Sequence, residues 1–272
     1  MAYRRTRILI LCKTYPSPSA SYVETSCVAG MEEDGTLLRL FPVPFRLLHE
    51  SARFKKWQWI EADIEKASDD HRPESHRIRA DNIQILGAPL PTKSAWAARR
   101  TWLSRLTRFT SFTTLDAARV ADGVTLGLLT VNQLLELEIA EARQADWTQD
   151  EREKLLQQQR QADLFIGSED RVLRTLRKIP YDFYYHYRTD LEPRELIHRH
   201  KVVDWEAGAL YWNVRRLHND SWEAKFRLKY WDELSSRDLM FLMGTIHRFP
   251  DQWLIVGVVY PPTQPQRALL PE

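Results

Sequence analysis

The chain has few cysteines and glycines: two and nine, respectively, among 272 residues. Cys12 and Cys27 cannot build a cysteine-rich zinc site, and both lie in apolar runs, so we interpret them as reduced core residues. The glycines form neither a P-loop nor a dinucleotide-binding fingerprint, and no Gly-x-Ser-x-Gly elbow is present. ATP hydrolysis, Rossmann-type redox chemistry and elbow-type nucleophilic catalysis are therefore not expected.

Long apolar runs are also absent. A membrane helix needs about 20 apolar residues, whereas the most apolar run, residues 253–260, has eight. The first apolar run, residues 8–12, is too short for the core of a signal peptide. We therefore expect a cytoplasmic protein without a membrane partner.

A strong charge of one sign is missing as well. The chain has 39 basic and 37 acidic residues, a formal net charge of +2. A balance this even creates no overall field that attracts polyanions. Any contact with nucleic acid must therefore come from a local patch. Hydrophobic residues make up 43% and charged residues 28% of the chain, which is typical of a globular protein.

Short apolar runs separated by turn residues fill the first third of the chain. Residues 7–13 are rich in leucine and isoleucine, and residues 22–30 and 36–41 flank an Asp34-Gly35 pair. Asp-Gly readily adopts the positive φ angles of a tight hairpin turn. Further strands are predicted over residues 57–64 and 78–86.

Helix signals follow Pro91. Ser94 can cap a helix in which residues 96, 99, 103 and 106 follow the 3.6-residue period. Thr130 and Gln133 match a capping box, which predicts a helix over residues 131–143. The same pattern recurs at Thr148 and Glu151, before a polar helix predicted over residues 154–161.

Strand signals return in the last part of the chain. Runs of strand-forming residues are found at 181–187, 198–205, 222–231 and 253–260. Residues 204–216 fit a helix equally well, and Ser235 is placed to start a short helix through residues 239–243. We predict an α+β fold with mostly antiparallel, β-rich N- and C-terminal parts and a helical segment between them. The predicted domains are a β-rich N-terminal domain (1–91), a helical segment that is a candidate insertion (92–177) and an α+β C-terminal domain (178–272).

Basic and aromatic residues are interleaved at four places. This mixture is typical of sites for single-stranded nucleic acid, where cations follow phosphates and rings stack on bases. The alternative is that the rings face the core and the basic groups are simply solvated. The candidate nucleic-acid-binding residues are Arg99, Arg100, Arg105, Arg108, Lys55, Lys56, Trp57, Trp59, Tyr185, Tyr187, Arg215 and Arg216.

One acidic constellation points to an enzyme. Asp204 is followed by Glu223-Ala224-Lys225, which resembles the acid and Glu-x-Lys arrangement of restriction-endonuclease-like nucleases. On a strand, Glu223 and Lys225 would share one face, where the carboxylate and Asp204 would hold Mg²⁺ or Mn²⁺. Val203 stands where that motif usually has proline. Alternating charges on a strand are also typical of a solvated face.

Two polar groups remain. Lys13, Tyr22, Glu24, Arg39 and Arg46 lie in or near apolar strands, and they are interpreted as a salt-bridge network or a candidate anion pocket. The histidines His198 and His200 alternate with Arg199 and Lys201, which favours a basic, solvated strand edge over a metal site. No metal or other cofactor is expected unless the nuclease hypothesis holds.

Three functions follow in order of preference. The first is nucleic-acid binding, with DNA or RNA undetermined. The second is a metal-dependent nuclease that uses Asp204, Glu223 and Lys225. The third is an adaptor or regulatory subunit that binds a protein partner through exposed aromatic residues.

Overall fold

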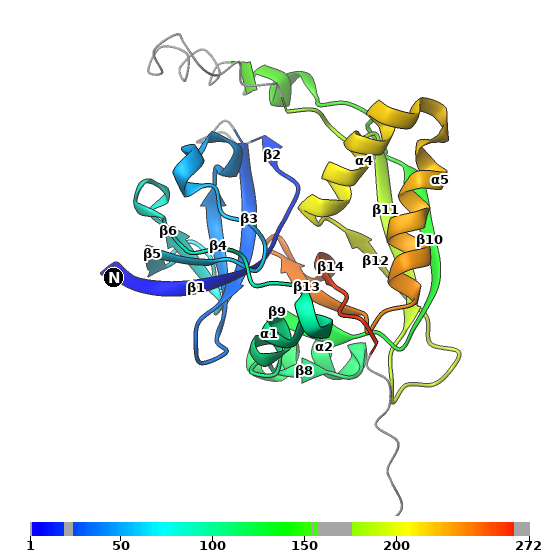
Figure 1. Ribbon diagram of the computed structural model, residues 1–272, viewed down its shortest axis with the longest axis horizontal. Helices are drawn as coiled ribbons and strands as arrows, with labels where there is room; N and C mark the ends of the chain where they lie inside the picture. The colour runs from blue at the N-terminus through cyan, green and yellow to red at the C-terminus, as the bar shows by residue number, and fades with distance from the viewer. Residues whose placement is uncertain (1, 19–23, 154, 157–175, 264–272) are drawn as a thin grey trace, which may run out of the picture.

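Two β-sheets organise the protein. The computed structural model describes residues 2–18, 24–153, 155–156 and 176–263. The first sheet contains strands β1 to β7 and the second contains β8 to β14 (Figure 1). Helices and both sheets together make a mixed α+β protein. No helix among the described residues is long and apolar enough to cross a membrane.

The first sheet closes into a five-stranded barrel. Its neighbours run β1-β3-β4-β6-β5, and β5 pairs with β1 to close the ring. Two short strands lie outside the ring, with β2 on β3 and β7 on β5. The bounds are β1 Arg4–Lys13, β2 Ser17–Pro18, β3 Glu24–Met31, β4 Leu37–Val43, β5 Trp59–Lys66, β6 Ser75–Ile78 and β7 Gln84–Leu86.

The barrel strands have the connectivity of an OB-fold. Counted along the chain, the five ring strands follow the order 1-2-3-5-4-1, and the third and fifth strands, β4 and β6, are parallel. Strand β1 pairs with two neighbouring strands. Its residues 4–9 pair with β5 and its residues 9–13 with β3, and the register with β3 shifts after Ile10. OB-folds are five-stranded Greek-key barrels of this kind. Alternate residues such as Ile8, Leu38 and Leu40 fill the interior.

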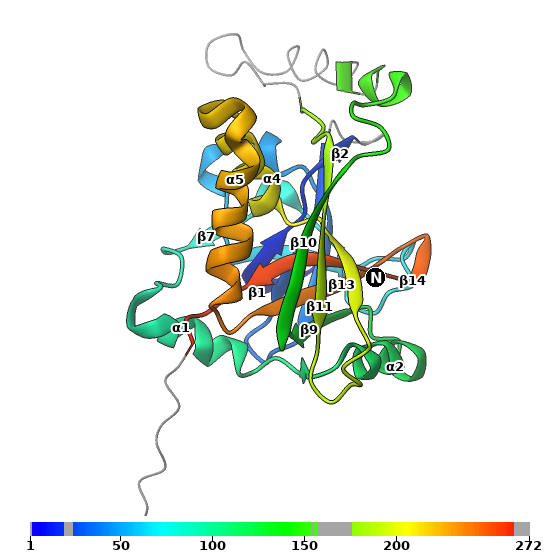
Figure 2. The same cartoon turned by 90° about the vertical axis from the view of Figure 1, so that its right-hand side faces the viewer.

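The second sheet has the order β10-β11-β12-β14-β13-β9-β8. Helices α4 and α5 cover one of its faces (Figure 2), where Val214 and Phe226 pack with Phe183 and Phe241 in one core. The strands are β8 Arg108–Phe109, β9 Leu126–Thr130, β10 Gln133–Glu141, β11 Tyr181–Arg188, β12 His198–Val202, β13 Met240–Ile246 and β14 Phe249–Val259.

Four α-helices are labelled among the described residues: α1 Lys93–Leu103, α2 Phe112–Asp122, α4 Trp205–His218 and α5 Trp222–Arg227. A π-helical turn, Leu228–Glu233, continues α5, and residues 149–153 are also helical. Short 3₁₀ turns are Phe45–Leu47, Glu50–Ala52, Ala80–Asn82 and Asn219–Ser221. Helices α1 and α2 lie at the lower end of the molecule in both ribbon views (Figures 1 and 2).

The barrel and the second sheet share a core. Leu9, Leu11 and Cys12 of β1 pack in one cluster with Leu242 and Val256 of the second sheet. The two sheets approach closely at Gly257, where an added Cβ atom would lie 2.6 Å from the Cβ atom of Cys12. Only glycine leaves room for this contact. The predicted core role of Cys12 is confirmed, and both thiols are free.

Several predicted elements are wrong. Residues 133–141 form strand β10 rather than a helix, because they pair along their length with β11. Residues 222–231 form α5 and the π-helical turn rather than a strand, because Trp222, Phe226 and Tyr230 at four-residue spacing enter the core. Residues 240–246 form β13, not a helix. The described residues of the segment 92–177 hold α1, α2 and a helical stretch at 149–153, but also the three strands β8, β9 and β10.

Other local predictions are confirmed. The strands predicted at 181–187, 198–205 and 253–260 are present as β11, β12 and β14, although β12 ends at Val202, and the helical alternative for residues 204–216 is correct. Thr148 and Glu151 form a reciprocal capping box, in which each side chain accepts a hydrogen bond from the backbone of the other. Most of the helix predicted over residues 154–161 lies outside the described residues.

Candidate functional site

A cavity of about 700 Å³ lies where the outer face of β3 and β4 meets the second sheet. Cys27 of β3 and Arg39 and Phe41 of β4 line it from the barrel. The loop between β5 and β6 and the turn between β13 and β14 supply other walls. A cavity of this size suits a ligand of about drug size, such as a nucleotide.

Alternation along β4 decides which side chains reach this cavity. Leu38 and Leu40 point into the barrel and are buried in its core. Arg39 and Phe41 therefore point outward, because successive side chains of a strand face opposite sides. Phe41 keeps 45% of its surface exposed, whereas Arg39 keeps only 3%.

The Arg39 guanidinium is buried without a carboxylate partner among the described residues. Its Nη2 donates to the carbonyl oxygen of Thr125 at 2.7 Å, and its Nη1 lies 3.9 Å from the Sγ of Cys27. Its Nε has no hydrogen-bond partner in the described part of the chain. An added Cβ atom on Gly244 would lie 3.3 Å from both terminal nitrogens, so the glycine leaves space for the guanidinium. A buried charge is normally paired, because burial without a partner is costly.

The loop after β5 ties the barrel to the second sheet. Arg72 donates to Asp70 through Nε and Nη2, and its Nη1 donates to the Thr245 carbonyl at 2.8 Å. The Glu74 carboxylate accepts hydrogen bonds from the backbone N–H groups of Thr125 and Leu126. These bonds hold the loop in place as one wall of the cavity.

Charge and hydrogen-bonding groups gather on these walls. Burial alone would raise the pKa of Asp70, but the hydrogen bonds from the side chain and backbone N–H of Arg72 outweigh it and hold that pKa well below its usual value. The buried hydroxyl of Thr245 has no hydrogen-bond partner among the described residues. The lining includes four arginines and two aspartates: Arg39, Arg72, Arg77, Arg248, Asp69 and Asp70.

A second charged group, the Lys56 cluster, consists of Lys56, Asp204 and Glu206. The Lys56 ammonium donates to Glu206 at 2.9 Å and to the Val258 carbonyl at 2.8 Å, and lies 3.7 Å from Asp204. Asp204 is the N-cap of α4: one oxygen accepts from the N–H of Glu206 and the other from that of Val258. This cluster joins the barrel to the start of α4 and to β14.

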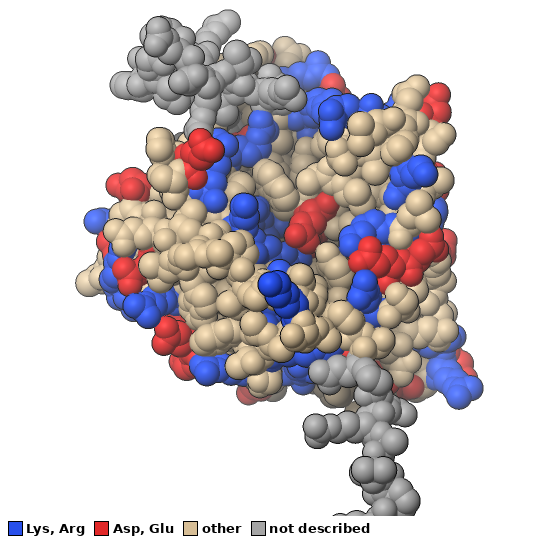
Figure 3. Space-filling view, viewed as in Figure 1, with Lys and Arg blue, Asp and Glu red and all other residues tan. Residues whose placement is uncertain are grey.

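Lys13 lies beside the Lys56 cluster among aromatic rings. Its Nζ is 3.9 Å from the centre of the Phe45 ring and 5.2 Å from that of Trp205. Burial lowers the pKa of Lys13 to about 8, although Glu206 and Asp204 oppose this. Burial also lowers the pKa of Lys56, but there Asp204 and Glu206 outweigh it and hold the pKa above its usual value. Figure 3 draws one face of the molecule, on which basic side chains surround a small acidic area near the centre.

Two family models match the chain, and they meet between α1 and β8. The model described as Domain of unknown function (DUF8757) matches residues 108–272. The chain belongs to this family. The model described as Domain of unknown function (DUF8758) matches residues 4–105. The cavity is thus lined by residues from both matched segments.

Comparisons with curated proteins and with solved structures add little information about function. No curated protein matches the chain. One solved structure is titled "Structure and Conformational Change of a Replication Protein A Heterotrimer Bound to ssDNA", and one of its chains is similar at 9% identity with a TM-score of 0.25. The match covers 95% of this chain and 66%, just under two thirds, of that chain. At this TM-score the likeness carries no argument.

Several residues predicted to stack on bases lie in the core. Trp57, Tyr185 and Tyr187 are at most 2% exposed, which leaves no ring face for a base. The Tyr185 hydroxyl donates to the Tyr230 carbonyl, and the Tyr187 hydroxyl pairs with His200. Trp59 is half-buried and packs edge-on against Trp102. The alternative that these rings belong to the core is correct for the three buried ones.

Three of the four arginines predicted for a helical patch contact other groups of the protein. Arg99 donates to the Leu90 carbonyl and covers Trp96, and Arg100 pairs with Asp238. Arg105 covers Trp102 and donates to the Glu33 carbonyl. Arg108 is exposed on β8.

The remaining predicted cations have mixed surroundings. Lys55 is exposed, whereas its neighbour Lys56 is 13% exposed and belongs to the Lys56 cluster. On α4, Arg215 pairs with Asp220, and the exposed Arg216 donates to Asn213. Substitution of the exposed Arg216 is therefore the simplest test of whether the surface of α4 contacts nucleic acid.

The residues predicted to form an anion pocket lie at different places in the structure. Glu24 and Arg46 form an ion pair at 3.0 Å, as the salt-bridge interpretation expects. Lys13 lies with the aromatic rings described above, and Arg39 faces the cavity instead. Tyr22 lies outside the described residues.

The nuclease hypothesis assumed that Glu223 and Lys225 lie on a strand, and the structure places them on a helix. Glu223 and Lys225 lie on α5, where side chains two apart point about 200° from each other, so they do not share a face. Glu223 accepts a hydrogen bond from Arg227 at 2.8 Å. Both oxygens of the buried Asp204 already accept backbone hydrogen bonds.

The histidine interpretation also needs correction. His198 is 8% exposed and contacts Glu192 at 2.6 Å, so it is not solvated. Burial, with the charge of His198, lowers the pKa of His200 to about 4. The basic neighbours pair across the sheet, Arg199 with Glu138 and Lys201 with Asp182.

Sequence reasoning missed the cavity almost entirely. Phe41, Asp70 and Thr245 carried no recognisable motif, because they come together only across more than 200 positions of the chain. The one local signal was the alternation of β4, which places a charged Arg39 between buried leucines.

Proposed function

We propose that the protein binds single-stranded nucleic acid in the cavity on the outer face of β3 and β4. The observation that carries this proposal is Arg39, a buried guanidinium that has no carboxylate partner among the described residues and lines a cavity. A phosphate group supplies the negative charge that such a site lacks. Guanidinium groups bind phosphate through two parallel hydrogen bonds.

The exposed ring of Phe41 supports the same ligand. Phe41 follows Arg39 on the same face of β4 and is 45% exposed. Sites for single-stranded nucleic acid combine cations that contact the backbone with rings on which bases stack. Arg248 adds an exposed positive charge to the lining, so a strand that leaves the cavity can contact it, whereas Arg77 pairs with Asp69 at 3.1 Å.

The barrel topology agrees with this placement. In OB-folds the face of the second and third strands and the adjoining loops bind oligonucleotides or oligosaccharides. Here these strands are β3 and β4, and the loop between the fourth and fifth ring strands contains Asp70 and Arg72. This support is an analogy at the level of the fold, and the site residues carry the proposal.

A binding experiment tests the proposal. Labelled single- and double-stranded DNA and RNA are incubated with the protein at several salt concentrations, and complexes are separated on a native gel. We expect single strands to bind, with an affinity that falls as salt rises. Phe41→Ala should weaken binding by about 5- to 150-fold, because one stacking contact contributes about 1–3 kcal/mol. Leu217→Ala on α4, where the side chain is 58% exposed, is the matched control.

The same gel distinguishes the alternatives. Equal binding by Phe41→Ala and the parent protein would contradict the cavity as the binding site. Parallel reactions with Mg²⁺, Mn²⁺ and EDTA test cleavage, the nuclease function for which Asp204, Glu223 and Lys225 are the candidates. Metal-dependent cleavage that survives Glu223→Gln would exclude the predicted triad.

A further inference from the structure

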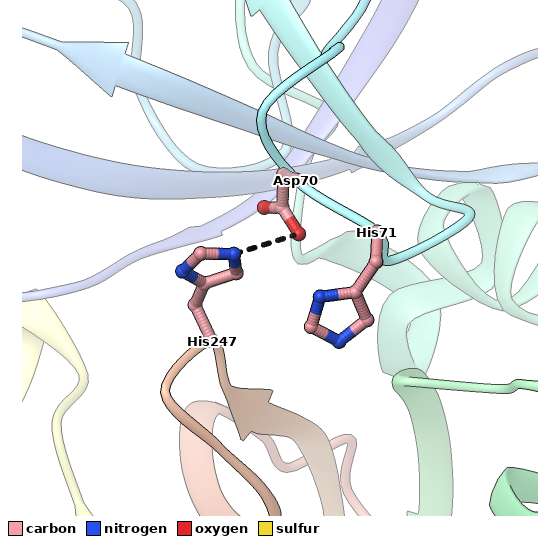
Figure 4. A group of neighbouring side chains, drawn as sticks. All are labelled: Asp70, His71 and His247. Carbon is pink, nitrogen blue, oxygen red and sulfur yellow. Dashed lines mark ion pairs between the residues drawn. The ribbon is translucent and has the colours of Figure 1, made fainter.

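Three potential metal ligands meet at the edge of the cavity. Asp70 and His71 lie in the loop between β5 and β6, and His247 lies in the turn between β13 and β14 (Figure 4). One ligand atom from each residue lies within 4.8 Å of the other two. His247 Nε2 is 3.9 Å from an Asp70 oxygen, and the two histidine rings face each other with centres 5.3 Å apart.

We propose that Asp70, His71 and His247 bind one divalent transition-metal ion. Two imidazoles and one carboxylate form a donor set that suits Zn²⁺ and also occurs with other first-row metals. Three protein ligands leave at least one coordination position open to water or another ligand. No sequence spacing indicates this site, because His247 is 176 positions from His71 in the chain.

The surroundings of Asp70 suit a ligand. Arg72 donates to both carboxylate oxygens at distances from 2.6 to 3.1 Å, and its own position is fixed by the Thr245 carbonyl. Hydrogen bonds of this kind orient metal ligands.

The two histidines can complete the site by small movements. Both His71 and His247 are exposed, and no hydrogen bond to another residue competes for the His71 ring among those that the structure describes. Ligand atoms at about 2.0–2.2 Å from a zinc ion lie closer together than the present spacing. Rotation of exposed side chains, which occurs within nanoseconds, can bring them there.

A metal ion at this location would have two effects. It would join a barrel loop to a turn of the second sheet, and so connect the segments that match the two different family models. Because Asp70 and His247 also line the cavity, the open coordination position would be near its ligand. The metal inference does not rest on the proposed nucleic-acid function, since metal binding is measurable without nucleic acid.

The test is a metal titration of the full-length protein. Metal is removed with EDTA, the EDTA is dialysed away, and ZnCl₂ is added in a calorimeter; CoCl₂ is added in parallel and followed by visible absorption. We expect one equivalent of metal to bind. His71→Ala and His247→Ala should each lower the affinity at least about 10-fold. His218→Ala, an exposed histidine on α4, should leave it unchanged.

Thermal unfolding separates binding from folding. Without metal, His71→Ala and His247→Ala should unfold at the temperature of the parent, because both side chains are exposed. Zn²⁺ should raise that temperature for the parent and for His218→Ala only. Absence of stoichiometric binding, or equal binding by the parent and both variants, would overturn the inference and leave a simple histidine–aspartate ion pair. Nucleic-acid binding in EDTA would still be observed if only the metal inference failed.

Discussion

The junction between the barrel and the second sheet buries two cations in different ways. At the Lys56 cluster the ammonium has two carboxylates within 3.7 Å and a carbonyl at 2.8 Å. In the cavity the Arg39 guanidinium has one carbonyl and one thiol, and its Nε has no hydrogen-bond partner among the described residues. Both groups connect the same two parts of the molecule.

The difference indicates what each cation does. A buried charge is costly unless its partners are all present, and a fully paired charge needs nothing further. Lys56 is therefore interpreted as a structural connection between the sheets. Arg39 retains capacity for an anionic ligand and lies beside the space for one. Buried charge alone does not indicate a site; the incomplete set of partners does.

Lys56→Met has the largest expected effect. The substitution leaves Asp204 buried without its cation, and breaking a buried pair costs about 3–5 kcal/mol of unfolding free energy. The loss should diminish at acidic pH, since burial raises the pKa of Asp204 and a proton can then neutralise it. Urea unfolding at pH 5 and pH 8 measures this, with the exposed Lys55→Met as control. A loss below about 1 kcal/mol would contradict a structural role.

Lys13 should give the next largest effect, seen as a pH dependence. Its pKa of about 8 in the folded protein lies below its ordinary value of 10.5. Between these pH values the unfolded state holds the proton and the folded state has released it, so this residue makes stability rise with pH. The rise should reach roughly 2–3 kcal/mol. Unfolding at pH 7.5 and pH 10 should show it for the parent but not for Lys13→Met; parallel pH profiles would be evidence against it.

Arg39→Met should reduce stability by only about 1–2 kcal/mol. The variant loses the bond to the Thr125 carbonyl but also removes a charge that is incompletely paired. Nucleic-acid affinity should fall much more than for any surface arginine. Urea unfolding and the gel assay are run on the same preparations. If Arg39→Met and Lys56→Met cost equal stability, the contrast between the two cations disappears.

Arg216→Ala should have the smallest effect. The side chain is exposed on α4 and bonds only to Asn213 among the described residues, so stability should change by less than about 0.5 kcal/mol. Binding of single-stranded nucleic acid should stay within about twofold of the parent, since one distant surface charge contributes little beyond the Debye length. A large loss of binding in the gel assay would move the interface from the cavity to α4.

Local sequence patterns predicted the barrel strands well and the second sheet less well. In β4, alternation of buried and exposed positions leaves one interpretation, since a helix would put Arg39 among the leucines. In residues 133–141, leucines and glutamates fit both the helical and the strand period. Pairing with β11 decides between them. For residues 222–231 the charges alternate, but the large rings repeat every fourth residue and determine the helix.

The sequence by itself determined the short apolar runs of the barrel strands and the position of the charged Arg39 within one of them, and it left residues 204–216 open between strand and helix. These follow from side-chain periodicity, which needs no distant partner. Only the tertiary structure decided that the barrel closes through β1 and β5, that Lys56 meets Asp204, and that Asp70 and His71 meet His247. Sheet register and loop position set these contacts across long chain separations, and local propensity carries no information about them.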